Sequence, residues 1–235
     1  MAATGAVLAG LAVALASVGG TGAQPVQVSR VVVSAAPAGR LAPVAAHPES
    51  GSASGVSPAW VSRVASAAGI PEPAVRAYGA ATLREHRDDP GCHLGWTTLA
   101  GIGWVESQHG TIGGRLLGED GRSDRPVLGP ALDGRGETAA IRSASGGWDR
   151  AVGPLQFLPS TWARWGADGD GDGVADPQDL DDAALAAGRY LCGAGGDLAA
   201  GTGWVTAVRA YNHADVYVRA VYDAASTYAT RTGSD

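Results

Sequence analysis

The amino-acid sequence predicts an all-α fold, and three observations lead to this class. Apolar residues recur at intervals of three and four, the spacing that gathers side chains on one face of a helix. No window shows the sustained alternation of apolar and polar residues that is typical of a strand. Glycine, 36 of the 235 residues, separates the periodic segments, as expected for loops between helices. We therefore expect an α-rich single domain with at most a small β-hairpin.

The first helix is expected to begin at Ser57-Pro58, because serine caps helices and proline suits their first turn. Apolar residues follow at helical spacing until Gly69 ends the run. The later helices are expected over residues 73–87, 93–109, 160–165, 179–191, 203–211 and 214–229. Between them, residues 111–150 lack a helical pattern, and a loop of this length inside a compact domain is usually functional or disordered.

The helix over 93–109 carries the carboxylate that stands out. Glu106 falls at helical spacing on the stripe formed by Trp96, Leu99 and Ile102, which is the face that a helix normally buries. Burial and the negative end of the helix dipole both raise a carboxyl pKa. A general acid that works near neutral pH needs such a shift. The alternative is an ordinary glutamate at a helix end that faces solvent.

Composition excludes several classes of function. The formal net charge is −6, with 17 arginines and no lysine. Mild acidity without a basic run argues against a nucleic-acid partner. The absence of lysine excludes a Walker-type phosphate loop and Schiff-base chemistry.

The two cysteines, Cys92 and Cys192, are expected to form a disulfide, since an even pair is typical of exported proteins. This bridge would close a loop of about 100 residues, worth about 4–5 kcal/mol in the chain-entropy account. Two buried free thiols are the alternative.

The N-terminal part predicts export. Residues 1–23 contain an apolar run and small residues before Gln24, as in a signal peptide. The first arginine is Arg30, so the basic start of a signal peptide is missing and a membrane anchor remains an alternative. Residues 24–57, rich in Ala, Pro and Ser, are expected to form a flexible tether. The folded domain is then expected over 58–230, in the extracellular space or cell envelope.

A second pattern predicts a metal site in residues 168–179. Aspartates stand at positions 1, 3, 5, 9 and 12 with glycine at position 6, which resembles the calcium loop of an EF-hand. Oxygen ligands in such a loop suit a structural Ca²⁺. The alternative is a solvated acidic turn that caps the next helix. The expected ligands are Asp168, Asp170, Asp172, Val174, Asp176 and Asp179.

Three blocks carry a resemblance to a known family: GIGWVESQHG (101–110), AVGPLQFLPSTW (151–162) and YNHADVYV (211–218). In this order they resemble the soluble-lysozyme-like domain of lytic murein transglycosylases, closest to the B-type membrane-bound group and its actinobacterial relatives. The likeness spans roughly residues 57–230. It implies a lysozyme-like fold and cleavage of the MurNAc-β-1,4-GlcNAc bond of peptidoglycan, with formation of 1,6-anhydro-MurNAc.

The resemblance also implies roles for particular residues. Glu106 corresponds to the family's single catalytic acid/base, and Gln156, Tyr211 and Asn212 to its substrate-binding residues. The expected partner is the peptidoglycan glycan strand, bound by a monomer. Two rival functions remain: a muramidase of the same fold that admits water, and a non-catalytic, calcium-ordered module that binds the cell wall.

Overall fold

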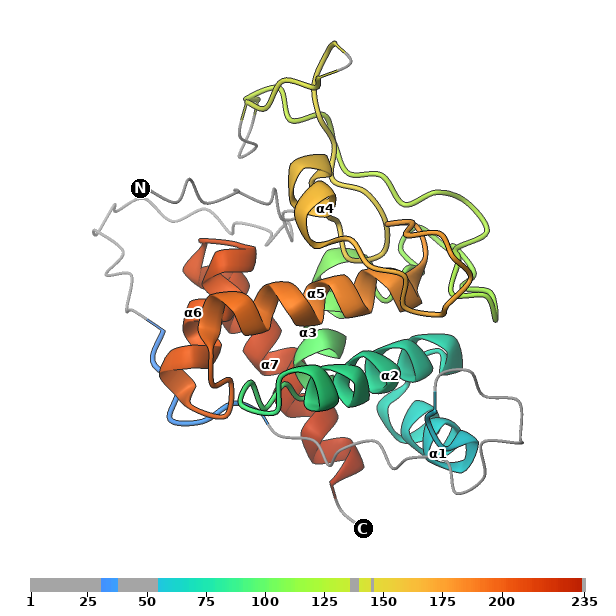
Figure 1. The fold of residues 1–235 in the computed structure, drawn as a ribbon, viewed down its shortest axis with the longest axis vertical. Coiled ribbons are helices and arrows are strands. Elements are labelled where there is room, and N and C mark those ends of the chain that lie inside the picture. The colour runs from blue at the N-terminus through green and yellow to red at the C-terminus, as the bar shows by residue number, and fades with distance from the viewer. Residues whose placement is uncertain (1–30, 38–54, 136–139, 145, 234–235) are drawn as a thin grey trace, which may run out of the picture.

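The computed structural model describes residues 31–37, 55–135, 140–144 and 146–233. Over these residues the fold is all-α, as predicted, and Figure 1 shows the helices packed around a central α3. Contacts between extended segments are isolated bridges and form no sheet in the described part. The helices are α1 Pro58–Ala68, α2 Glu72–Asp88, α3 Trp96–Ser107, α4 Pro159–Trp165, α5 Leu180–Gly195, α6 Gly201–Tyr211 and α7 Asp215–Thr232.

Local sequence signals explain most helix ends. Pro58 occupies the first turn of α1, and Gly69 ends that helix in a left-handed conformation, with its N–H bonded to the Ala65 carbonyl. The helix expected over 93–109 is shorter at both ends. His93, Gln108 and His109 all adopt positive φ angles between 53° and 61°, which takes them out of the helical region.

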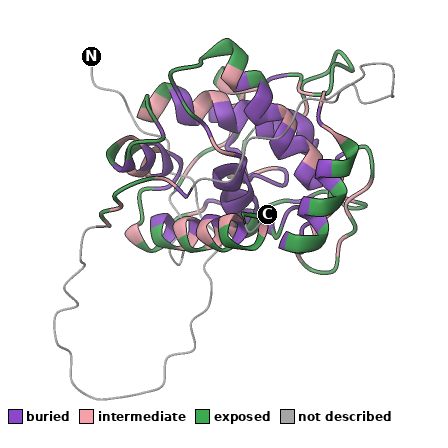
Figure 2. Ribbon diagram, turned by 90° about the horizontal axis from the view of Figure 1, so that it is seen from below, coloured by how far each residue is buried: buried purple, intermediate pink, exposed green. Residues whose placement is uncertain are grey.

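Helix α3 forms the centre of the core. Ten of its twelve residues are buried, including Glu106, and buried residues gather in the interior of the ribbon in Figure 2. Two glycines allow this close packing. A Cβ on Gly101 would lie 2.7 Å from the Val221 carbonyl of α7, and one on Gly103 would lie 2.0 Å from the Tyr78 hydroxyl of α2. A side chain at either position would push these helices apart.

Helix α5 packs against α2 and α6, and the predicted disulfide joins it to the loop after α2. Cys92 and Cys192 are bonded, with their Cα atoms 5.3 Å apart. The bridge spans 100 residues of sequence. It therefore holds the segment just before α3 against α5. Helix α5 follows the aspartate-rich residues 168–179, the acidic loop.

The segment between α3 and α4 has no helix in its described residues and extends above α4 in Figure 1. Its outer part folds back on itself through the bridges Asp133–Ala140 and Arg142–Trp148. The Arg142 guanidinium lies 4.0 Å from the centre of the Trp148 ring. This arm corresponds to the long loop expected over 111–150.

Part of the segment expected to be a flexible tether lies against the domain. Ala35 forms a bridge with Ala200, and the Thr97 hydroxyl donates a hydrogen bond of 2.6 Å to the Pro37 carbonyl. Residues 31–37 therefore cross the start of α6 and reach α3. The predicted signal or anchor, residues 1–23, lies outside the described residues. None of the described helices has both the length and the apolar character needed to span a membrane.

Candidate active site

Glu106 lies in the last turn of α3, with 2 % of its surface exposed. Burial raises the pKa of its carboxyl to about 8, and a hydrogen bond from the Tyr217 hydroxyl partly opposes that rise. The Tyr217 oxygen donates to Oε1 over 2.7 Å. A carboxyl with this pKa is mostly protonated at pH 7, so Glu106 is a proton donor at neutral pH. The buried glutamate predicted from helical spacing is confirmed, while its catalytic role stays a prediction.

Tyr217 connects Glu106 with another buried tyrosine. The rings of Tyr211 and Tyr217 are parallel within 5°, with centres 6.5 Å apart. The Tyr211 hydroxyl donates a hydrogen bond of 2.7 Å to the Leu155 carbonyl. Two tyrosines thus link the acid on α3 to the loop that carries Gln156.

The sequence analysis did not single out Tyr217 as a site residue. The available signal was its place in the block YNHADVYV, next to the segment that supplies Tyr211. Its contact with Glu106 joins residues 111 positions apart in sequence. Helical spacing within one segment does not reveal such a pair.

Gln156 lies in the turn after residues 151–155 and has 3 % of its surface exposed. Its Nε2 donates to the Gly153 carbonyl over 2.8 Å, and its backbone has a positive φ of 51°. A second tie joins this turn to the end of α3, because the Ser107 hydroxyl donates to the Pro154 carbonyl over 2.6 Å. The Gln156 turn is therefore fixed beside the residue that follows Glu106.

Asn212 follows the last residue of α6, and 7 % of its surface is exposed. Its Oδ1 accepts a hydrogen bond of 3.0 Å from the Ala214 N–H, just before α7. Like Gln156, it bonds to the backbone, so both amides hold local structure. Their role as substrate-binding residues, and that of Tyr211, stays a prediction.

His109 is a buried histidine just beyond the end of α3. It has 2 % of its surface exposed and hydrogen-bonds through Nδ1 with Tyr78 of α2 and through Nε2 with Tyr228 of α7, over 3.1 and 3.0 Å. Burial lowers its pKa to about 3, so the ring is neutral near pH 7. It ties the end of α3, three residues beyond Glu106, to two other helices.

The acidic loop gathers three carboxylates. Oxygens of Asp168, Asp170 and Asp182 lie within 4.8 Å of one another. Asp182, buried in α5, also accepts backbone hydrogen bonds from Gly169 and Asp176 over 2.6 and 2.8 Å. Two carboxylates from a glycine-rich loop and one from the following helix fit a hard cation such as Ca²⁺. Asp182 is not among the ligands expected from the loop pattern.

Two aspartates of the expected ligand set have other partners. Asp179 caps α5 by accepting from the Asp181 N–H over 2.9 Å, and its other oxygen lies 3.4 Å from Arg122 Nε. Asp176 accepts from Arg122 Nη1 over 2.5 Å. An arginine from the long loop thus compensates the charge at positions 9 and 12, and the part of Asp176 and Asp179 in a metal site stays a prediction. Asp182, three residues after Asp179, joins the cluster instead.

The acidic loop also supports the Gln156 turn. A Cβ on Gly153 would lie 1.6 Å from the Pro177 carbonyl, so only glycine allows this contact. The side-chain amide of Gln178 accepts from the Val127 N–H and donates to the Val127 carbonyl over 3.0 and 3.2 Å. Order in the acidic loop therefore bears directly on the position of Gln156.

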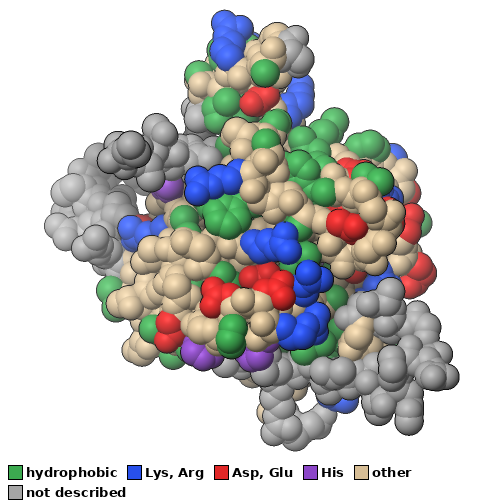
Figure 3. All heavy atoms as spheres, in the orientation of Figure 1, with side chains coloured by type: hydrophobic (Ala, Val, Ile, Leu, Met, Phe, Trp, Pro, Cys, Tyr) green, Lys and Arg blue, Asp and Glu red, His purple; other side chains and the backbone are tan. Residues whose placement is uncertain are grey.

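On the face shown in Figure 3, acidic and basic side chains lie side by side, without a continuous basic area.

The fold thus places a buried, protonated Glu106 near the turn that carries Gln156. Residues 134–209 match the family described as "Transglycosylase SLT domain". The match covers 76 of the 235 residues. The matched residues include Gln156 and the acidic loop, but neither Glu106 nor Tyr211. The B-type and actinobacterial likeness stays a prediction.

Three solved structures show similarity to this chain. Two are the Escherichia coli lytic transglycosylase Slt35, in complex with bulgecin A (14 % identity, 74 % of this chain and 75 % of that one) and with calcium (16 %, 74 % and 76 %). The third is a 36 kDa muramidase/transglycosylase, with 16 % identity over 74 % and 76 % of the two chains. The TM-score is 0.45 in each case. No curated protein sequence matches the chain.

Proposed function

We propose that this protein cleaves the MurNAc-β-1,4-GlcNAc bond of peptidoglycan and forms 1,6-anhydro-MurNAc, with Glu106 as its single general acid/base. The observation that carries this proposal is the state of Glu106, a buried carboxyl with a pKa of about 8 that accepts a hydrogen bond from Tyr217. The chemistry needs a proton donor at neutral pH, and few carboxyl groups are donors there.

In the first step, protonated Glu106 gives its proton to the glycosidic oxygen as the bond to muramic acid C1 breaks. The N-acetyl oxygen of the same sugar attacks C1, so no carboxylate nucleophile is needed. In the described part of the chain, burial and the Tyr217 hydrogen bond shift the pKa of Glu106.

In the second step, ionised Glu106 removes the proton of the C6 hydroxyl, and O6 attacks C1 to displace the acetamido oxygen. This closes the 1,6-anhydro ring and returns the proton to Glu106, so the enzyme regains its starting state. Between the steps the carboxylate is charged and buried. The Tyr217 hydroxyl stabilises that charge, because a hydrogen bond to an ionised acceptor is stronger than one to a neutral group.

Gln156, Tyr211 and Asn212 are proposed to bind the glycan strand around Glu106. The amides of Gln156 and Asn212 offer hydrogen bonds without adding charge beside the acid. Tyr211 lies parallel to Tyr217 and holds the Leu155 carbonyl. Its contribution is therefore to keep the hydrogen-bond donor of Glu106 in place.

Calcium is proposed as a structural ion of residues 168–182. Asp168, Asp170 and Asp182 would supply carboxylate oxygens, with Asp172 and the Val174 carbonyl as further donors at the usual loop positions. Asp176 and Asp179 contribute through Arg122 instead. The ion would stabilise the loop that supports the Gln156 turn, and it takes no part in bond cleavage.

Export to the cell envelope, as a monomer, is proposed from two features. One is the apolar segment at residues 7–18, whether it acts as a signal peptide or as a membrane anchor. The other is the disulfide between Cys92 and Cys192, since such bonds persist in oxidising compartments. Peptidoglycan lies in the same compartment.

The test is mass spectrometry of the fragments that the purified protein releases from peptidoglycan. The wild type is expected to release 1,6-anhydro-muramyl products, and Glu106→Gln to release almost none while it keeps its unfolding temperature. Glu85→Gln is the matched control, because Glu85 is a second buried glutamate, on α2, with 3 % of its surface exposed. This control is expected to keep the wild-type activity.

The same measurement separates the rival functions. Products heavier by one water would identify a muramidase. Full activity in Glu106→Gln would refute the catalytic role of Glu106. Binding to peptidoglycan without release of fragments would identify a non-catalytic wall-binding module.

A further inference from the structure

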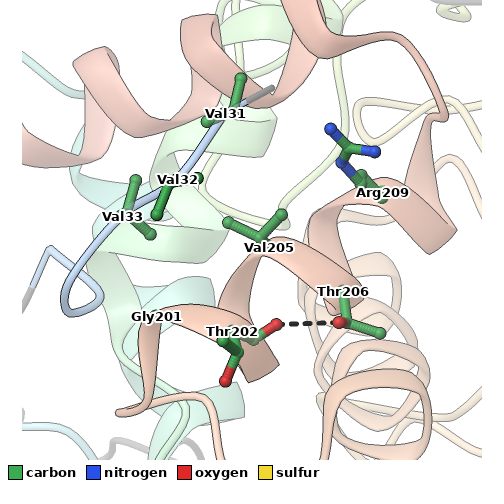
Figure 4. Close-up of a pocket in the computed structure, with 8 residues that line it drawn as sticks. All are labelled: Val31, Val32, Val33, Gly201, Thr202, Val205, Thr206 and Arg209. Carbon is green, nitrogen blue, oxygen red and sulfur yellow. Dashed lines mark hydrogen bonds between the residues drawn. The ribbon is translucent and has the colours of Figure 1, made fainter. Parts of the chain in front are cut away.

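A cavity of about 300 Å³ lies between the extended residues 31–33 and the outward face of α6 (Figure 4). This volume is at the lower end for small-ligand sites, which enclose roughly 300–1,000 Å³. Neither the catalytic scheme nor the acidic loop uses this cavity. It is lined by Val31, Val32, Val33, Gly201, Thr202, Val205, Thr206 and Arg209.

The walls of the cavity are mainly apolar, and Arg209 adds polar donors. Its Nη2 forms an ion pair with Asp215, which compensates the charge. Its Nε is buried and has no hydrogen-bond acceptor among the described residues. A buried N–H without an acceptor is unfavourable, so this guanidinium would gain a favourable contact if it reoriented toward a ligand oxygen. Because Asp215 balances the charge, Arg209 suits a peptide oxygen as well as a carboxylate.

Residues 31–33 add a row of backbone groups. Within the described part of the chain, Val31, Val32 and Val33 make no hydrogen bond, and Val32 has 84 % of its surface exposed. Gly201 allows this segment to lie close to α6, since a Cβ there would be 1.8 Å from the Val33 carbonyl. An extended segment whose N–H and C=O groups have no partner among the described residues can pair with another extended chain.

The residues that line the cavity indicate whether it suits a glycan or a peptide. None of the described residues that line the cavity is aromatic, whereas a site for a sugar ring usually offers an aromatic face for stacking. Valine side chains and an extended backbone edge instead suit a peptide with small apolar side chains. The features of the cavity therefore favour a peptide over a glycan.

We propose that this cavity binds a short extended peptide, with an alanine-sized side chain against Val31, Val33 and Val205 and a peptide oxygen at Arg209. The identification of this peptide as the stem peptide of peptidoglycan rests on the proposed function.

Helix α6 connects the cavity to the site. Arg209 faces outward, while Tyr211, two residues on, is fully buried and stacks on the tyrosine that contacts Glu106. A stem peptide held at Arg209 would thus position the attached glycan strand relative to Glu106.

The test titrates the full protein, followed by backbone NMR shifts, with two probes prepared from one peptidoglycan sample by amidase treatment: free stem peptides and peptide-free glycan strands. We expect the stem peptides to shift residues of the cavity. Thr206→Trp fills the cavity from an exposed position and should weaken stem-peptide binding at least tenfold. Arg209→Gln should weaken it as well.

Thr227→Trp is the matched control, because Thr227 is also exposed on a helix and its hydroxyl donates to the carbonyl four residues earlier over 2.8 Å, as that of Thr206 does. It should bind the peptides as the wild type does. With intact peptidoglycan as substrate, Thr206→Trp should raise KM. With peptide-free glycan strands, its KM should equal that of the wild type.

Unchanged peptide binding in Thr206→Trp, or no binding by the wild type, would overturn the proposal. The proposal would also be overturned if the glycan strands, and not the stem peptides, shifted the NMR signals of the cavity residues. Failure of the proposed function is a separate result, since Glu106→Gln and the product masses test it without any change to the cavity. Peptide binding by a protein that releases no anhydro product would support the cavity and refute the catalysis.

Discussion

Glu85 and Glu106 are both buried glutamates, and burial raises the pKa of both. Among the described residues, Glu85 Oε1 has no hydrogen-bond partner and lies 3.9 Å from Arg189 Nε, whereas Glu106 Oε1 accepts from Tyr217. An acid that must also act as a base needs a partner that stabilises its ionised form, and only Glu106 of this pair has a neutral one.

Replacing Tyr217 with phenylalanine tests this partner. The hydrogen bond from Tyr217 lowers the pKa of Glu106, so its loss should raise that pKa further above about 8. The alkaline limb of the kcat profile should then move to higher pH. Since the carboxylate formed between the two steps loses its stabilisation, kcat should fall by about tenfold or more, the effect of a lost hydrogen bond to a charged group.

Tyr222→Phe on the same helix is the control, because the Tyr222 ring packs edge-on against Trp204 away from Glu106. It should keep both the rate and the pH profile. A Tyr217→Phe enzyme with an unchanged alkaline limb would show that the tyrosine does not tune Glu106.

For single residues, the sequence predicted burial only where it follows from the spacing within one helix. The spacing of Trp96, Leu99, Ile102 and Glu106 predicted the buried acid because all four residues share one helix face. Tyr217 and His109 could not be predicted in the same way. Their burial depends on contacts with other helices, which the periodicity of their own segments does not contain.

At the scale of elements, the end of α3 has a specific anchor. Gln108 and His109 both adopt left-handed conformations, and His109 hydrogen-bonds with Tyr78 and Tyr228. Since α7 also carries Tyr217, this anchor fixes α3 against the helix that supplies the donor to Glu106. The shortening of the expected helix 93–109 therefore coincides with the formation of a buried contact.

His109→Phe should destabilise the fold by about 2–4 kcal/mol at pH 7.5, because two buried tyrosine hydroxyls lose their partners. The histidine has a second, pH-dependent effect. Its folded pKa of about 3 lies below the unfolded value of about 6.5, so the unfolded state takes up the proton first as pH falls. The wild type should lose stability from this group between about pH 6.5 and 3, whereas His109→Phe lacks that loss.

The difference between the two proteins should therefore shrink as the pH is lowered, which urea unfolding at pH 7.5 and pH 5 measures. His213→Phe, at an exposed histidine, should show little change at either pH. A constant difference for His109→Phe across this range would mean that the buried ring does not resist protonation.

At the scale of the whole molecule, long-range ties convert separate motifs into one site. The disulfide fastens α5 to the entrance of α3, Ser107 holds the Gln156 turn, and Arg122 joins the long loop to the acidic loop. The order of the motifs and the cysteine pair were predictable because local patterns mark them. The partners of Arg122 and the contact of residues 31–37 with α6 were not, since neither segment has a periodicity that marks a contact.

For the acidic loop, the sequence motif and the structure predict different effects of two substitutions on calcium binding. The loop pattern predicts that Asp179, at position 12, completes the calcium site, whereas in the structure Asp182 joins Asp168 and Asp170. Calcium should raise the free energy of unfolding of the wild type by RT ln(1 + [Ca²⁺]/Kd), which is about 2.7 kcal/mol at a hundredfold excess over Kd. The unfolding temperature should rise with it. For a domain of this size that corresponds to roughly 5–11 °C.

Asp182→Asn should abolish this calcium-dependent rise. Asp179→Asn should keep the rise but unfold at a lower temperature both with and without calcium, because it weakens the Arg122 pair. Thermal unfolding of the three proteins in calcium and in chelator measures both effects. If Asp179→Asn lost the rise and Asp182→Asn retained it, Asp179 would be the calcium ligand, as the EF-hand pattern predicts. Arg122 of the long loop would then not act together with the metal site. The expected result would instead mean that the ion and Arg122 act on opposite ends of one loop, and that chelation weakens the support of the Gln156 turn without touching Glu106.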